Sequence, residues 1–414
     1  MHNLISTALI TLFLGGASLI SIAAQHTAEL LRPKIPVSFS LTKGARKEFR
    51  LQLKEDEFAE LISLASDDLE LEFDIFDPSG KPIKSGDSYT DVALFVAPTA
   101  GEYRIVVKIA EDSKLTGNQK IWLEFNNAFK LPDGTKQKDI RRVNGYDVRI
   151  MTAPGSKGED AKSIVIIEKA GKLKKILRHF GGEHVAQAGF YFADDVTKAD
   201  TAAKKRSASL VANTLDKSGD GTPDVMINYF SGGGHCCEIT YFMNLGKTVE
   251  DLDVVEAEAE PIIATEKNPR GGLSFELSDT EYDCWNLPKI MLLFAGGKLR
   301  PDIERMRKPV PSLAELKSRA RAARELLDSK PYLGDGILGD GCTPYKDDAK
   351  VQTTFWSEML DLMISGNKEL AWQYFDLVWP AEKKGKELFL EHLKEKLSYS
   401  EHWRTILDDG KSNQ

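Results

Sequence analysis

The chain has 414 residues, which at roughly 100 to 200 residues per domain predicts two to four domains with sizeable cores. Hydrophobic residues make up 42% and charged residues 29%, a composition that excludes wholesale disorder and a polytopic membrane protein. The 55 Lys and Arg against 63 Asp and Glu give a net charge of −8. No nucleic-acid partner is expected, because phosphate backbones attract basic surfaces.

The N-terminal segment carries a targeting signal. Residues 4–22 form a largely apolar run without a charged side chain, and the small residues Ala23 and Ala24 follow it. This pattern predicts a signal peptide over residues 1–24, an extracytoplasmic (periplasmic or secreted) protein, and no membrane span after cleavage. The segment before the run has no Lys or Arg, and the run approaches the roughly 20 residues that span a bilayer, so an uncleaved anchor is the alternative.

Export determines how the cysteines are interpreted. Cys236, Cys237, Cys284 and Cys342 are an even set, and disulfides persist in an oxidising compartment. Neighbouring residues of a strand point to opposite faces, so Cys236 and Cys237 are expected to pair separately with Cys284 and Cys342, in an order left open. A zinc site that includes His235 is the alternative, although no CxxC pair supplies the usual ligand spacing.

Residues 36–127 are predicted to form a β-sandwich. Leu69, Leu71, Phe73 and Ile75 alternate with acidic residues, and shorter alternating runs occupy 37–41, 49–53 and 100–107. With its "DPSGKPI" and "APTAGEYRIVV" stretches, the segment resembles the bacterial pre-peptidase C-terminal (PPC) domain. That resemblance implies a secreted accessory module for binding or spacing, without catalytic residues.

A polar linker is expected at 128–142 and a second β-rich domain at 143–308. The expected strands lie at 146–151, 163–168, 190–192, 225–230, 236–245, 273–277 and 289–294. The basic cluster of Lys169, Lys172, Lys174 and Lys175 around Gly171 predicts a solvated hairpin turn, with a small anion site as the alternative.

The 216–224 segment has the spacing of a calcium loop. Asp216, Ser218, Asp220 and Asp224 occupy positions 1, 3, 5 and 9, and the Thr222 carbonyl occupies position 7. Position 12 is an isoleucine inside an apolar strand, so an EF-hand is excluded, and a turn without metal is the alternative. The loop running into "DVMINY" resembles the calcium loops of FG-GAP repeat proteins, which build β-propeller blades. About fifty residues later, 270–277 matches 220–227 as a degenerate copy without the acids.

Gly232, Gly233, Gly234 and His235 follow the strand at 225–230. The simpler interpretation is a hairpin connection, since glycines allow positive φ. The alternative is a hydrolase pocket with His235 as acid and base, although the chain has neither GxSxG nor HExxH. The sequence does not require His179 or His184 to lie near His235.

The GDGxPD, SGGxHCC and MRKP motifs resemble those of a family of uncharacterised exported bacterial proteins, over about residues 210–400. The resemblance implies an FG-GAP-like (or VCBS-like) β domain followed by helices, and no activity. The second loop, "NPRGGLSF", lacks the acids of that pattern.

From residue 311 the apolar period becomes helical, and a helical domain is predicted at 311–410. Ser312 and Glu315 have capping-box spacing at the start of a helix that ends near Leu327. A Pro, Gly and Asp-rich loop at 330–350 and helices at about 351–364, 367–378, 381–397 and 400–407 follow. Trp356, Trp372, Trp379 and Trp403 are expected to be packing anchors, with a sugar-stacking surface as the alternative.

Together these features predict a multidomain, mainly β protein with a C-terminal helical bundle. The favoured function is an exported, non-catalytic binding or interaction protein with a calcium-stabilised β domain. Its expected partner is an extracytoplasmic protein or glycan. The alternative is an exported hydrolase that uses the 232–235 loop.

Overall fold

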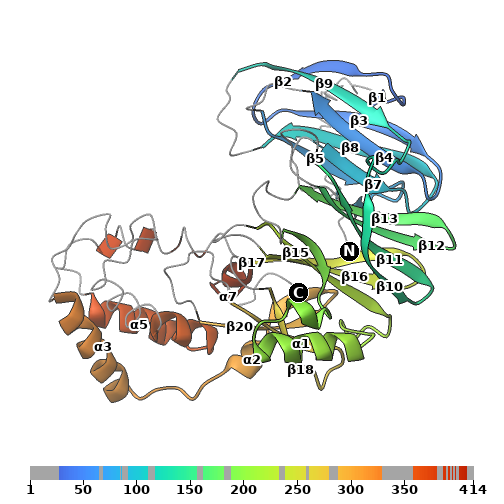
Figure 1. Cartoon of the computed structure of the whole chain (residues 1–414). Coiled ribbons are helices and arrows are strands. Elements are labelled where there is room, and N and C mark those ends of the chain that lie inside the picture. Colours follow the sequence, from blue (N-terminus) through green and yellow to red (C-terminus); the bar gives the residue numbers. More distant parts are fainter. Residues whose placement is uncertain are drawn as a thin grey trace, which may run out of the picture.

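The computed structural model describes most of the chain from residue 28 onward. The described residues are 28–64, 69–83, 85, 92–110, 117–155, 162–180, 188–232, 238–257, 261–278, 288–328, 358–379, 386, 387, 390, 391, 394, 397 and 401–407. Within these residues the architecture is mainly β, with helices concentrated in the C-terminal part (Figure 1).

Two sheets of the N-terminal part pack face to face as a β-sandwich. The first has the order β1-β3-β8-β5-β6 and the second the order β2-β9-β4-β7. The strands are β1 (Glu29–Leu30), β2 (Val37–Leu41), β3 (Arg46–Leu53), β4 (Phe58–Leu64), β5 (Leu71–Phe76), β6 (Pro82–Ile83), β7 (Val92–Val96), β8 (Gly101–Ile109) and β9 (Gln119–Asn126). Alternate residues such as Phe49, Leu51 and Leu53 are buried in a shared core. The alternation seen in the sequence therefore produces strands with one buried face.

Three further sheets follow in succession, each an antiparallel meander of four consecutive strands. The first contains β10 (Lys136–Val143), β11 (Tyr146–Ala153), β12 (Lys162–Lys169) and β13 (Lys172–Phe180). The second contains β14 (Gly189–Phe192), β15 (Asp224–Phe230), β16 (Glu238–Leu245) and β17 (Val249–Ala257). The third contains β18 (Ile263–Lys267), β19 (Leu273–Leu277), β20 (Ile290–Ala295) and β21 (Lys298–Pro301). Four-stranded meanders in series are the unit of a β-propeller, although propellers typically need at least four such blades.

Hydrophobic side chains join the successive meanders. The first and second share a cluster that includes Val148, Val165, Phe190 and Ile227. In the cluster that joins the second to the third, the rings of Phe242 and Phe275 meet at 5.2 Å between centroids. Strand β15 is covered on both faces by these clusters, so most of its residues are apolar. Its polar residues are considered below.

Helix α1 (Ala202–Asn213) precedes the 216–224 loop and covers β18. The Ser207 hydroxyl accepts the Ala264 N–H at 2.8 Å, and Arg206 donates to the Thr265 carbonyl at 2.8 Å. The short helix η1 (Val196–Lys198) leads into α1. Together they occupy the chain between β14 and β15, so the second meander contains a helical insertion.

The predicted linker at 128–142 is wrong. Lys136–Val143 forms β10, which pairs with β11, and upstream of it Phe129 and Leu131 pack against a hydrophobic cluster. That cluster joins the sandwich to the first meander and contains Phe58, Leu94, Val96, Met151, Ala153, Ile164, Ile166 and Ile176. The segment therefore packs between the two units and then enters the first meander.

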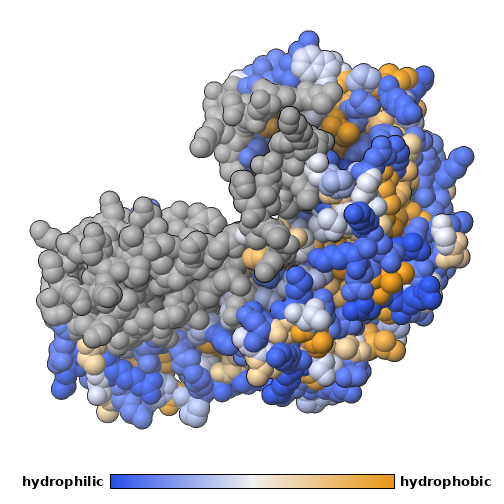
Figure 2. Space-filling model, viewed as in Figure 1, coloured by the Kyte–Doolittle hydropathy of each residue, from blue (hydrophilic) through white to orange (hydrophobic). Residues whose placement is uncertain are grey.

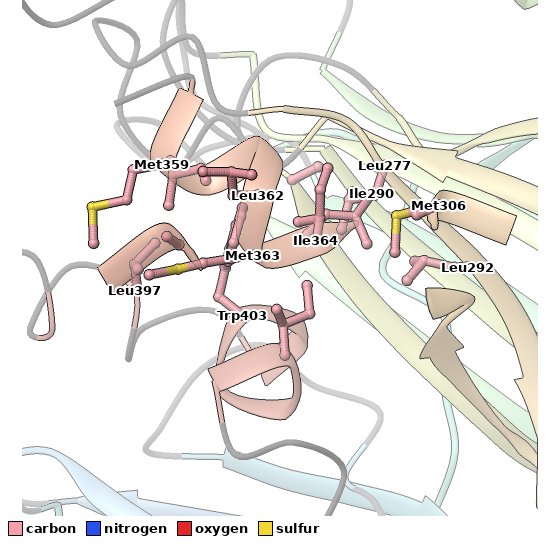
Figure 3. Packing of buried hydrophobic residues seen from close by; sticks show 14 of the residues in the cluster. Leu277, Ile290, Leu292, Met306, Met359, Leu362, Met363, Ile364, Leu397 and Trp403 are labelled. Carbon is pink, nitrogen blue, oxygen red and sulfur yellow. The ribbon is translucent and has the colours of Figure 1, made fainter. Parts of the chain in front are cut away.

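The C-terminal helices pack against the third meander. They include α2 (Ile303–Met306), α3 (Leu313–Asp328), α5 (Lys368–Val378) and α7 (Glu401–Leu407), and residues 358–364 are also helical. Ser312 and Glu315 form the predicted capping box, with the Ser312 N–H donating to Glu315 at 2.8 Å. Trp403, Met363 and Ile364 lie in the same cluster as Leu277 and Leu292 of the sheet (Figure 3). Helices and sheet thus share a hydrophobic core.

The surface of the molecule is mostly hydrophilic where Figure 2 shows described residues, with hydrophobic residues scattered among them. No helix within the described residues is long and apolar enough to cross a membrane.

Candidate functional site

The predicted calcium loop lies between α1 and β15 and contacts the third meander. The Leu273 N–H donates to the Lys217 carbonyl at 2.8 Å, which joins the 216–224 loop to the start of β19. Gly219, Gly271 and Gly272 all have positive φ, and a Cβ at Gly272 would lie 2.5 Å from the Lys217 carbonyl oxygen. The loop and its degenerate copy therefore lie side by side, and β15 and β19 are each the second strand of their meanders.

The acidic side chains of this loop bind its own backbone. Asp216 accepts the N–H groups of Gly219 at 2.6 Å, Asp220 at 3.1 Å and Gly221 at 2.8 Å. Asp220 accepts from the Thr222 N–H at 2.7 Å and from the Asn244 amide at 2.7 Å. These bonds wind the loop tightly around two carboxylates.

Asp224 closes the loop from β15. Its Oδ2 atom accepts the N–H groups of Lys217 at 2.8 Å and Ser218 at 2.7 Å, while its buried Oδ1 atom has no hydrogen-bond partner. Burial raises the pKa of Asp224 to about 6, and the nearby Asp220 charge acts in the same direction. The buried Lys217 ammonium donates to the Thr214 and Asp224 carbonyls at 2.9 and 2.8 Å, and burial lowers its pKa.

Calcium prefers oxygen ligands, and each carboxylate oxygen retains lone pairs beyond the bonds just described. The donor chemistry and the unpaired Asp224 oxygen fit such an ion. Across the part of the chain that the structure describes, however, no three acidic, His or Cys side chains are grouped with metal-ligand spacing. The Ser218 hydroxyl lies 3.5 Å from Asp216 and the Thr222 N–H is bound to Asp220, so the predicted ligand set is close in space without forming a cage.

A second polar cluster, which the sequence analysis missed, lies on the face of the second meander that is turned toward α1. It consists of Tyr191 of β14, Asn228 of β15, and Glu238 and Thr240 of β16. The Tyr191 hydroxyl donates to the two Glu238 oxygens at 3.1 and 3.2 Å, and Thr240 donates to Asn228 at 3.0 Å. Asn228 and Glu238 are polar residues in strands buried on both faces, which is the signal that could have revealed them.

His179 lies on β13 of the first meander and packs against the opposite face of the second meander. Its Nε2 atom is bound to the Tyr241 hydroxyl, and its ring lies 4.0 Å from the Tyr229 ring between centroids. Burial lowers the pKa of His179 to about 4, so the imidazole is neutral at physiological pH. His179 therefore acts as a packed core residue.

The remaining predicted site residues lie outside the described residues. These are His235, Gly233, Gly234, Cys236, Cys237, Cys284 and Cys342, together with the signal peptide and the 330–350 loop. Gly232 is described and has φ of 91°, a value that glycine adopts readily. The disulfide pairing and the catalytic role of His235 thus stay predictions. The hairpin at Gly171 is confirmed, but Lys174 and Lys175 are paired with Asp56 and Asp251 and are not solvated.

Comparison with known proteins gives no family. No protein-family model and no curated protein matches the chain. Two solved structures with local likeness are PliG, a periplasmic lysozyme inhibitor of g-type lysozyme, from Aeromonas hydrophila and from Salmonella Typhimurium. They are 15% and 8% identical, cover 24% of this chain and 97% and 100% of their own, and have TM-scores of 0.20 and 0.17. TM-scores this low carry no argument about fold or function.

Proposed function

We propose that this chain is an exported, non-catalytic binding or interaction protein whose β core is stabilised by calcium in the 216–224 loop. The observation that carries the proposal is the geometry of the loop. Its backbone N–H groups donate to the carboxylate of Asp216, and a buried oxygen of Asp224 has no hydrogen-bond partner. A cation there would offset both the repulsion between carboxylates and the missing partner.

The 216–224 loop contacts two of the meanders, so an ion that makes the loop more rigid would stabilise both of them. It contacts β19 through Lys217 and Leu273, and β16 through Asn244. An ion bound there would hold the second and third meanders together, and a rigid β framework is what a binding surface needs to keep its shape. The predicted export signal supports an extracytoplasmic protein or glycan as the partner, and the acidic net charge disfavours nucleic acid.

The test is the effect of calcium on thermal unfolding of the mature protein. An ion that binds only the folded loop raises stability by mass action, so chelation should lower Tm and added calcium should restore it. Asp220→Asn should melt at the same temperature with and without calcium. Asp133→Asn is the matched control, because Asp133 lies in an exposed turn and pairs with Lys130 at 3.2 Å; it should keep the full response.

Calorimetric titration with calcium separates binding from stability. The wild-type protein and Asp133→Asn should bind the ion, and Asp220→Asn should bind it more weakly or not at all. Melting curves of wild-type protein that coincide with and without chelator, together with no heat of calcium binding, would remove calcium from the proposal. The binding function would then need another stabilising device.

A further inference from the structure

The Tyr191, Asn228, Thr240 and Glu238 side chains lie on one face of the second meander and form two hydrogen-bonded pairs. Thr240 donates to the Asn228 oxygen at 3.0 Å, and the Tyr191 hydroxyl donates to the Glu238 oxygens at 3.1 and 3.2 Å. Asn228 of β15 is the direct partner of Tyr191 of β14 in the strand register. The Tyr191–Glu238 pair therefore joins β14 to β16 across β15.

Glu238 is poorly compensated for a buried carboxylate. Its two oxygens share the single proton of the Tyr191 hydroxyl, although a carboxylate can accept about four hydrogen bonds. Its side chain is buried, and within the described part of the chain no Lys or Arg forms an ion pair with it. A buried charge in this position is costly, whereas a neutral carboxyl is not.

The charged groups facing the cluster come from the helical insertion. Lys198 of η1 and Lys204 of α1 act on Glu238 from a distance, and the Lys204 amine is paired with Asp200 at 3.2 Å. Asp195 acts on Tyr191 in the opposite sense. Burial is the largest influence and raises the pKa of Glu238 to about 7, against a pull in the other direction from Tyr191 and the two lysines.

We propose that Glu238 is a buried carboxyl that the folded protein keeps protonated, so that its ionisation at higher pH destabilises the end of the second meander where the Tyr191 hydroxyl of β14 contacts it. Glu238 is the first residue of β16 and pairs with Phe230, the last residue of β15, so the contact lies at the end of this strand pair. The inference goes beyond the proposed function and does not depend on calcium.

The direction of the pH effect follows from the pKa. In the unfolded chain Glu238 loses its proton near 4.5, and in the folded protein it does so near 7. Below both pKa values Glu238 is neutral in the folded and the unfolded state, so its ionisation does not lower the folding stability. Between them the unfolded state binds fewer protons, so stability falls as pH rises, and above about 7 the full cost is present. This is opposite to the usual behaviour of a salt-bridged carboxylate.

The experiment compares Glu238→Gln with wild-type protein between pH 5 and pH 8. Gln keeps an acceptor oxygen for Tyr191 but cannot ionise. The Tm of the variant should therefore fall less than that of the wild type between pH 5 and pH 8, and at pH 8 the variant should have the higher Tm. Glu256→Gln is the control, because Glu256 is an exposed carboxylate on β17 opposite Ile239 and should leave the wild-type profile unchanged.

Two further measurements keep the proposal testable if Glu238→Gln does not fold. Infrared spectroscopy of wild-type protein should show a protonated carboxyl that titrates near pH 7. Tyr191→Phe removes the hydroxyl that donates to Glu238 and so disfavours the ionised form, which should move that titration to higher pH. Parallel Tm profiles of Glu238→Gln and wild type, or a Glu238 carboxyl that titrates near its ordinary value of 4.5, would overturn the proposal.

Discussion

At the scale of single residues, the contact between the 216–224 loop and its degenerate copy depends on glycine. Gly272 has φ of +70°, and a Cβ there would lie 2.5 Å from the Lys217 carbonyl oxygen and 2.7 Å from the Gly219 nitrogen. Those neighbours are backbone atoms, which cannot move aside as a flexible side chain would. Close backbone packing therefore explains the two glycines of "NPRGGLSF", a segment that lacks the acidic residues of the 216–224 loop. A second metal is not needed to explain them.

Replacing Gly272 by Ala should be strongly destabilising. Gly296, in the hairpin between β20 and β21, also has positive φ but has open space where a Cβ would lie. Gly296→Ala should cost only the roughly 1 to 2 kcal/mol of the left-handed conformation. Gly272→Ala adds a steric clash and should cost more, as measured by urea unfolding. Equal losses for the two variants would show that the loops do not pack as closely as described.

Much of the polar site could not be predicted from the sequence. The spacing of Asp216, Asp220 and Asp224 indicates a tight loop whatever its ligand, so the loop could be predicted from the sequence. Glu238 follows two cysteines in a segment where a charged residue is expected to face water. Its position inside the predicted strand at 236–245 was the one signal available, while its burial is set by packing against another part of the chain.

At the scale of elements, strands were predictable where they alternate or are wholly apolar, as in β2, β11, β12 and β15. Strand β10 was missed because it is an edge strand with its first three residues exposed, so it has no apolar face. Helix α1 was missed because its buried residues are only Ser207, Ala208 and Val211, too small and too few for an apolar stripe.

The polar contact of α1 gives a test of its role. Ser207→Ala would leave the Ala264 N–H of β18 buried and unpaired, which should cost about 1 to 3 kcal/mol. Ser209→Ala, on the exposed side of the same helix, should change stability by less than about 0.5 kcal/mol. Denaturant unfolding measures both, and hydrogen exchange at the Ala264 amide should become faster only in Ser207→Ala. Unchanged exchange there would mean that α1 does not cover this strand in solution.

At the scale of the whole molecule, the sandwich, the three meanders and the helices form a continuous series of packed layers (Figure 1). The PPC resemblance implied an accessory module for binding or spacing, and the polar segment at 128–142 was expected to be a linker after it. The structure instead places Phe58 and Val96 of the sandwich against Ile164 and Ile176 of the first meander. The sequence could not reveal this, because a sheet that is apolar on both faces does not indicate which unit covers it.

Ion pairs accompany this hydrophobic contact, and they allow the docking to be tested. Asp56 of the sandwich is bound by Lys174 and faces Lys172 at 3.6 Å, and its side chain is only 12% exposed. Its φ of 65° lies in the left-handed region, which Asn tolerates, so Asp56→Asn removes the charge without adding backbone strain. Loss of one partner from a half-buried pair should cost about 1 to 2 kcal/mol, between the values for exposed and buried pairs.

The expected result is a shared transition. Because the sandwich and the first meander bury a common cluster, calorimetry should show them unfolding together, and Asp56→Asn should lower that single transition. Glu102→Gln, which breaks the exposed Arg50–Glu102 pair within the sandwich, should leave it nearly unchanged. A sandwich that unfolds separately, at a temperature unaffected by Asp56→Asn, would instead favour the independent accessory module implied by the sequence resemblance.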